Sequence, residues 1–286
     1  MNAEFSNIHW FPGHMTKTFR LIESELRHVD ILIELLDARI PLSSKNPQLA
    51  SATANKPRLL VLNKSDLADE RATKAWESFY RDRGYGALSL SSRDKRGPMK
   101  AVDAALALLT NKDAISGKKR LAKPAAMVIG VPNVGKSTFI NALAGSTRAK
   151  AEDRPGVTRG KQWISLPRIE LLDMPGVLWK KLENQNGALL LAFTGAIKDG
   201  VLDGQEISAC LLGLLKRDYS EMLKSRYKLD DSDLDQDNFE LLSEIARHRG
   251  MLMPGGIPDT ERAAAMVLDE LRAGKLGNIT FEEAPR

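Results

Sequence analysis

Three mostly apolar runs stand out in the first 173 residues of the chain. They cover 31–36, 58–62 and 125–129, and stretches with the spacing of amphipathic helices lie between them. Apolar residues occupy successive positions in these runs, which is typical of strands that are covered on both faces. The pattern therefore predicts an α/β domain with a mostly parallel sheet and helices on both faces.

The pattern changes after about residue 179, where strand signals disappear. Apolar residues at helical spacing predict helices near 187–198, 204–216, 238–249 and 258–273, with an acidic interruption from Asp230 to Asp237. We therefore expect two domains. The first is the α/β domain over residues 1–180, which includes an N-terminal arm 1–16, and the second is a small all-helical domain over residues 181–286.

Net charge, apolar segments and cysteine content exclude few classes of protein. A net charge of +5 and a sequence pI near 9.2 are compatible with a polyanionic partner or with nothing more than a soluble surface. The chain begins without a basic stretch and long apolar run, and no apolar segment is long enough to span a bilayer. Cys210 is the only cysteine, so no intramolecular disulfide can form. We expect a cytoplasmic protein without a membrane partner.

A phosphate-binding loop follows the third apolar run. Residues 130–137 (GVPNVGKS) match the pattern GxxxxGK[ST], and a helix-like segment begins at Thr138. In such a loop backbone N–H groups surround the phosphates, the lysine (Lys136) reaches the β and γ oxygens, and the hydroxyl of Ser137 binds Mg²⁺. The residues expected to contact the nucleotide here are Asn133, Val134, Gly135, Lys136, Ser137 and Thr138.

The segment NKSD, residues 63–66, follows the second apolar run and favours guanine as the base. The Asp66 carboxylate can accept hydrogen bonds from the ring N–H and the exocyclic amine of guanine, whereas adenine leaves it unpaired, at a cost of about 1–3 kcal/mol. Asn63 shapes the base pocket, and the stem of Lys64 can lie against the purine. Ser91 and Ser92 follow the next strand and offer backbone N–H groups to the guanine oxygen, although such serine pairs are often only turn formers.

Two further segments match sensors of the γ-phosphate. Residues 173–176 (DMPG) fit the DxxG element, in which Asp173 meets Mg²⁺ through water and the Gly176 N–H contacts the γ-phosphate. Thr158 lies in the loop RPGVTRG and is the natural second sensor and magnesium ligand, although that loop can also be a flexible Gly/Pro turn. Val177 stands where a Ras-like enzyme has a glutamine that orients water, so intrinsic hydrolysis should be slow.

The base-reading motif precedes the phosphate loop, which predicts a circularly permuted P-loop GTPase domain. With residues 10–15 (WFPGHM), 37–41 (DARIP), 155–158 (PGVT), 246–250 (ARHRG) and 274–277 (GKLG), this order strongly resembles the ribosome biogenesis GTPase A family over nearly the whole chain. The resemblance implies binding of GTP and GDP and a GTPase of late large-subunit maturation, stimulated by the precursor particle. It also implies rRNA binding by the helical domain and a chain that is monomeric when free.

The resemblance also implies roles for two further residues. His14, in the PGHM motif, has been proposed in such families to assist hydrolysis, although contact with rRNA or packing beside Trp10 and Phe11 is an equal alternative. Asn133 resembles the asparagine of potassium-activated relatives, so K⁺ is a second expected ion beside Mg²⁺. Asparagine at that position can equally serve the backbone geometry alone.

Two other function classes compete with this interpretation. A nucleotide-gated binding module for RNA or protein, with little turnover, would use the same motifs. An ATP-dependent kinase or ATPase is disfavoured by Asp66, because the carboxylate does not fit adenine.

Overall fold

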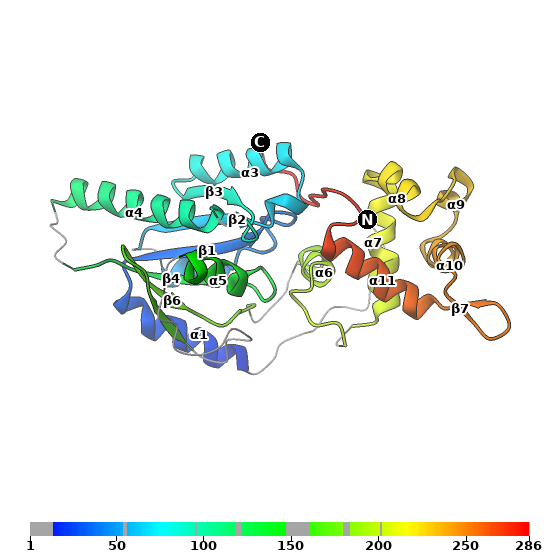
Figure 1. Cartoon of the computed structure of the whole chain (residues 1–286), viewed down its shortest axis with the longest axis horizontal. Helices are drawn as coiled ribbons and strands as arrows, with labels where there is room; N and C mark the ends of the chain where they lie inside the picture. Colours follow the sequence, from blue (N-terminus) through cyan, green and yellow to red (C-terminus); the bar gives the residue numbers. More distant parts are fainter. Residues whose placement is uncertain are drawn as a thin grey trace. The chain divides into compact units, whose positions relative to one another are not determined.

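The computed structural model describes residues 14–53, 56–94, 96–117, 122–146, 161–179, 184–200 and 202–285 (Figure 1). They form two compact units. One unit holds the described residues up to 179 together with those from Thr280 onward, and it contains the large sheet. The other holds the described residues from 184 to Ile279. Among the residues described, no helix is both long and apolar enough to cross a membrane.

The sheet of the first unit has the order β3-β2-β1-β4-β6-β5. All neighbours are parallel except the pair β5 and β6. Its strands are β1 (Ile31–Asp37), β2 (Arg58–Asn63), β3 (Gly86–Leu90), β4 (Ala125–Gly130), β5 (Gln162–Ser165) and β6 (Glu170–Asp173). The expected mostly parallel, circularly permuted α/β architecture is confirmed, and β2 and β4 lie on either side of β1.

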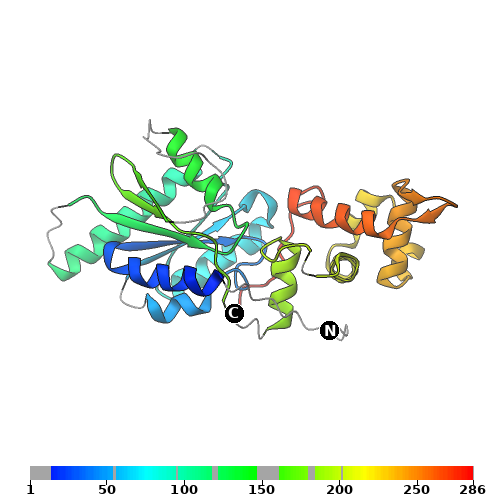
Figure 2. The ribbon, with the colours of Figure 1, turned by 90° about the horizontal axis from the view of Figure 1, so that it is seen from below.

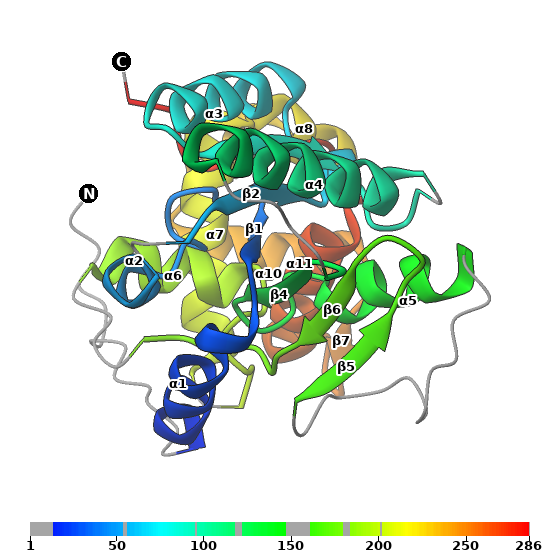
Figure 3. The ribbon, with the colours of Figure 1, turned by 90° about the vertical axis from the view of Figure 1, so that its left-hand side faces the viewer.

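Helices cover both faces of this sheet, and α1 and α5 lie on opposite sides of it (Figures 2 and 3). The helices of this unit are α1 (His14–Glu25), η1 (Leu26–His28), α2 (Pro47–Ala52), η2 (Ser65–Leu67), α3 (Glu70–Asp82), α4 (Gly97–Ser116) and α5 (Lys136–Ser146). Every residue of β1 and β2 is buried. The two-sided cover explains why successive positions of these strands are apolar.

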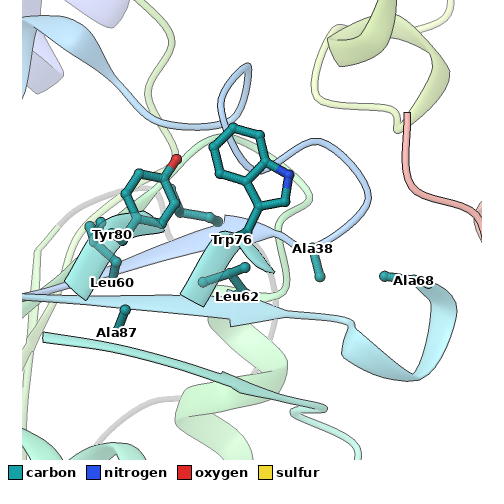
Figure 4. Close-up of a cluster of buried hydrophobic side chains, with 8 residues drawn as sticks. Ala38, Leu60, Leu62, Ala68, Trp76, Tyr80 and Ala87 are labelled. Atoms are coloured by element: carbon teal, nitrogen blue, oxygen red, sulfur yellow. The ribbon is translucent and has the colours of Figure 1, made fainter. Parts of the chain in front are cut away.

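Strand β2 shows the two-sided packing residue by residue. Leu60 and Leu62 belong to a cluster with Trp76 and Tyr80 of α3 (Figure 4). Leu59, the residue before Leu60, faces the other side, where it and Leu108 of α4 both lie against Gly86. The Trp76 and Tyr80 rings pack at 5.5 Å between centroids, which adds aromatic contacts to this part of the core.

The second unit is built around α7, which packs against α10 and α11. Its helices are α6 (Gln185–Phe193), α7 (Gly204–Asp218), α8 (Ser220–Tyr227), α9 (Asp231–Asp235), α10 (Asn238–His248) and α11 (Thr260–Ala273). The expected acidic interruption contains α9, because Asp230 and Asp233 form a capping box that satisfies the first backbone N–H groups of the helix.

The second unit is not entirely helical. A short hairpin of β7 (Leu252–Met253) and β8 (Ile257–Pro258) projects from it (Figures 1 and 2). Gly255 and Gly256 make the turn with positive φ angles of 85° and 77°, which glycine adopts without steric cost. The end of the chain also differs from the expected boundaries, because residues from Thr280 onward belong to the unit that contains the large sheet.

Candidate nucleotide-binding site

Parallel register brings the predicted motifs to one edge of the sheet. Asn63 at the end of β2 pairs with Asp37 at the end of β1 and with Leu90 at the end of β3. On the other side of β1, Gly130 at the end of β4 pairs with Leu35. The carboxyl ends of these strands therefore lie along one edge of the sheet, which is where open α/β sheets bind ligands.

The phosphate loop lies between β4 and α5, and its conformation requires glycine at position 135. Gly135 has a φ of 101°, and a Cβ there would lie 2.4 Å from Nδ2 of Asn63. Asn133 also has a positive φ, 56°, in the left-handed region that asparagine tolerates. Ser137 and Thr138 are exposed in the first turn of α5, so the amino end of this helix can meet an anion.

Lys136 is held inside the loop by backbone carbonyls. Its Nζ donates to O of Gly130 at 3.0 Å and to O of Val131 at 2.8 Å. Burial lowers the pKa of Lys136 to about 8, against the opposing influence of the Asp173 carboxylate. A bound phosphate would supply the negative charge that the site lacks, so ligand binding restores the fully charged lysine.

Gly176 brings the DxxG element against the phosphate loop. A Cβ at this position would lie 2.9 Å from Cα of Pro132 and 3.0 Å from Nζ of Lys136. Only glycine permits this approach without displacing the loop. Asp173 at the end of β6 is 3% exposed. The structure therefore places Gly176 against the loop and Asp173 close enough to Lys136 for its charge to act on that residue.

Asn63 joins three segments through its buried side chain. Its Nδ2 donates to O of Val134 at 2.8 Å, and its Oδ1 accepts from N and Oγ of Ser92 at 2.9 and 2.8 Å. Both Asn63 and Ser92 are buried. Asn63 thus ties the phosphate loop to the loop after β3, which is a more definite role than shaping the base pocket. Ser92 is anchored by its backbone and its side chain.

Asp37 and Arg39 extend this network, and the motif analysis did not assign them to the site. Arg39 donates from Nε and Nη2 to the two carboxylate oxygens of Asp37 at 2.9 and 2.8 Å. Lys64 donates from Nζ to Asp37 Oδ2 at 3.0 Å and to O of Asn133 at 2.7 Å. Burial alone would raise the pKa of Asp37, but Arg39 and Lys64 hold it well below its usual range. The sequence signal that could have identified Asp37 is its position directly after the apolar run 31–36, at the end of a predicted strand.

Asp66 and Ser91 remain accessible beside this network. Asp66 lies in η2, and its exposed carboxylate forms no hydrogen bond with the residues that the structure describes. Ser91 is half-buried, and its Oγ accepts from N of Arg93 at 3.3 Å. Lys64 precedes η2 with a left-handed φ of 60°, which turns the chain sharply between Asn63 and Asp66. Asp66 can therefore accept from a base while Asn63 stays in the core.

Comparison with known proteins agrees with this geometry. A family model described as 50S ribosome-binding GTPase matches residues 125–228. A ribosome biogenesis GTPase A from Bacillus cereus is 45% identical over 96% of this chain and 93% of its own length, and that from Thermotoga maritima is 32% identical over 96% and 93%. The chain belongs to the ribosome biogenesis GTPase A family. It is therefore a GTP hydrolase of ribosome biogenesis, as the motifs indicated.

Solved structures of this family share the fold. The GNP-bound YlqF from T. maritima covers 94% of this chain and 98% of its own, at 28% identity and a TM-score of 0.65. A GDP-bound YlqF gives the same TM-score and identity over 92% and 99% of the two chains. Likeness over both whole chains supports the permuted GTPase fold.

The family implies a divalent metal, and the residues present fit one. The exposed Ser137 offers a hydroxyl in the first turn of α5, and Asp173 offers a carboxylate at the end of β6, close enough to Lys136 for its charge to act on that residue. Oxygen donors of this kind are those that Mg²⁺ prefers. Thr158, the other predicted ligand, lies outside the described residues.

The start of α1 lies beside the segment that follows the DxxG element. His14 is the first residue of α1, and its side chain lies outside what the structure describes. The next residue, Met15, is 2% exposed, and its Sδ accepts from N of Leu178 at 3.4 Å. Val177 is fully buried, and its N donates to O of Gly130 at 3.3 Å. The side chain after DxxG therefore packs in the core of this GTPase.

Most arginines of the helical unit are paired within it. Arg226 and Arg249 both pair with Glu270, and Arg249 also lies over the Tyr227 ring, 5.3 Å from its centroid. The other pairs are Lys224 with Glu221 and Asp231, Arg217 with Asp218, Arg247 with Glu244, and Arg272 with Asp199 and Asp269. In the part of this unit that is described, Lys228 and Lys275 are exposed and form no ion pair.

Proposed function

We propose that this GTPase acts in the cytoplasm, as a monomer when free, during late assembly of the large ribosomal subunit, and that the precursor particle stimulates its hydrolysis of GTP. The observation that carries this proposal is Val177, fully buried where a Ras-like enzyme has its water-orienting glutamine. Such a site holds GTP without the usual means of hydrolysing it. Stimulation by a partner explains how turnover is timed.

The nucleotide is held by groups from four strand ends. Asp66 accepts from the guanine base, and the backbone N–H of Ser91 meets its oxygen. The N–H of Ser92, which the sequence also suggested for this contact, instead donates to Asn63. The phosphates lie in the loop from Asn133 to Thr138 with Lys136 on the β and γ oxygens. Ser137, Thr158 and, through water, Asp173 would hold Mg²⁺, and the ion would supply positive charge opposite the phosphates. The Gly176 N–H contacts the γ-phosphate.

His14 is our candidate for the group that assists the attack of water. The contact of Met15 with Leu178 supports this role, because it places the first turn of α1 beside the residues that follow Val177. An imidazole there can orient or polarise a water molecule. The alternative is a structural or RNA-binding role for His14. The variant His14→Ala separates the two, since a catalytic role lowers stimulated hydrolysis and leaves GTP affinity unchanged.

We propose that the helical unit binds rRNA. The description of the matched family model, 50S ribosome-binding GTPase, supports the large subunit as partner. Because most arginines of this unit are paired internally, exposed lysines such as Lys228 and Lys275 are the better candidates for phosphate contacts. Replacing each should weaken binding and reduce its salt dependence.

The second candidate is a nucleotide-gated binding module with little relevant turnover, and the buried Val177 favours it equally. One experiment separates the two. GTP hydrolysis is measured with and without large-subunit precursors at physiological salt, and sedimentation with a non-hydrolysable GTP analogue records association. We expect association together with stimulated hydrolysis. Association without stimulation would leave only the binding module, and the absence of both would refute the ribosomal role.

Potassium is a separate proposal that rests on Asn133. Its exposed position and left-handed backbone in the phosphate loop are compatible with an ion beside the phosphates. Hydrolysis in K⁺ should exceed hydrolysis in Na⁺ at equal ionic strength. The difference should disappear in Asn133→Ala, and equal rates in the two salts would exclude the role.

A further inference from the structure

The last residues of the chain return to the sheet unit and lie along two of its loops. N of Phe281 donates to O of Arg39 at 2.8 Å, and Thr280 Oγ1 accepts from N of Asp69 at 3.0 Å. Nε1 of Trp76 donates to O of Glu282 at 2.9 Å. Each contact joins residues more than 200 positions apart, so this attachment is tertiary and not a product of local sequence.

Glu282 makes the densest part of the attachment. Its Oε2 accepts from N of Leu42 at 2.7 Å, and its Oε1 accepts from N and Oγ of Ser43 at 3.0 and 2.5 Å. Burial raises the pKa of this carboxyl, against the opposing effect of these donors. A carboxylate is costly to bury unless donors surround it. Two backbone N–H groups and a hydroxyl provide that surrounding here.

The loops that receive these contacts are those that carry the base site. The loop after β1 contains Arg39, whose side chain holds Asp37, and Asp37 in turn holds Lys64. Lys64 reaches the phosphate loop at O of Asn133. The second loop runs from Lys64 through η2 to Asp69 and contains Asp66. Residues 280–282 therefore contact the loop after β1, which is joined to Lys64 through Asp37, and also contact Asp69 at the end of the loop that contains Asp66.

We propose that residues 280–285 form a strap that positions the guanine-reading segment, with Glu282 as the positioning residue that holds the strap in place. This inference rests on guanine-nucleotide binding and does not depend on the ribosome. The strap continues directly from Ile279, the last residue of the helical unit. A change in the helical unit that detaches the strap therefore lowers the affinity of the base site for guanine nucleotide. By linkage, nucleotide binding stabilises the attached strap.

Neighbouring glutamates supply a matched pair of variants. Glu282→Gln keeps the shape of the side chain but turns one acceptor into a donor that faces backbone N–H groups. Glu283→Gln makes the same change at an exposed residue that has no such partners. Affinity is measured for GDP and for IDP, which lacks the exocyclic amine that Asp66 accepts. We expect Glu282→Gln to lose about tenfold in GDP affinity and much less in IDP affinity, with Glu283→Gln unchanged.

Two outcomes would overturn the proposal. Equal losses for GDP and IDP would mean that the strap only stabilises the unit, and unchanged affinities would mean that it is not coupled to the base site. Trp76→Phe covers the case in which Glu282→Gln does not fold, because it removes the donor to O of Glu282, together with part of the indole, and keeps an aromatic ring in the core. It should reduce the GDP to IDP preference in the same direction.

Hydrogen exchange tests the linkage in the unmodified protein. The amides of Leu42, Ser43 and Phe281 are the donors that join the strap to the loop after β1. Their exchange should slow when GDP binds, while exchange at the amide of Ile115, an exposed residue of α4, should not change. Unchanged exchange at all three amides under saturating GDP would contradict the coupling.

Discussion

The side chain of Asn63 should contribute to the stability of the sheet unit as well as to nucleotide binding. Asn63→Ala removes three hydrogen bonds, one to O of Val134 and two from Ser92. At about 0.5–1.5 kcal/mol each, they contribute roughly 1.5–4.5 kcal/mol. The variant also leaves the N–H of the buried Ser92 without its acceptor. We therefore expect a loss of about 2–4 kcal/mol in the stability of the sheet unit.

Native-state hydrogen exchange of the β2 amides measures this loss for the unit that contains Asn63. Binding of GDP to the folded fraction is measured in parallel, and it should weaken at least tenfold because the phosphate loop and the loop after β3 are no longer tied together. Asn111→Ala is the control, since Asn111 is exposed on α4 and its replacement should change stability by less than about 0.5 kcal/mol. A loss below 1 kcal/mol with unchanged GDP affinity would refute the assigned role.

Four further predictions concern buried groups. With the pKa of Lys136 near 8 in the empty site and higher beside phosphate, GDP binding at pH 9 should take up protons, and buffer-independent binding enthalpies would contradict this. The same shift means that the empty protein gains stability as the pH rises from about 8 toward 10.5. Val177→Gln should not raise intrinsic GTP hydrolysis, because position 177 is fully buried; faster hydrolysis at unchanged urea stability would show that the side chain reaches the site. Arg58→Met leaves the buried Glu34 without its ion-pair partner and should cost about 3–5 kcal/mol by urea unfolding, whereas the same change at the exposed Arg168 should cost less than about 1 kcal/mol.

Local patterns in the chain were sufficient for the sheet and for the order of the motifs. Consecutive apolar residues predicted β1, β2 and β4 with boundaries within one residue, because a strand covered on both faces leaves that record in the sequence. The phosphate loop was also recognisable, because its glycines and Lys136 must stand at fixed spacing to surround a phosphate. The same holds for Gly176, which no other residue can replace beside Pro132.

Short polar helices and paired charges were harder to predict. The acidic stretch after Asp230 indicated an interruption, yet its carboxylates cap α9. Charges of the helical unit pair in ways that residue spacing does not show, because Arg226 and Arg249 share Glu270. Sequence spacing does not reveal such pairs, because the partners are 44 and 21 positions apart.

The sequence by itself determined that this chain is a guanine-nucleotide hydrolase with permuted motifs, since Asp66, Lys136 and Asp173 each carry their chemistry in a short segment. Only the tertiary structure decided how these segments are held together. Asn63 meets Val134 across the sheet, and Glu282 meets Ser43 from the far end of the chain. Such contacts depend on strand order and on the path of the chain in space, which no local pattern encodes.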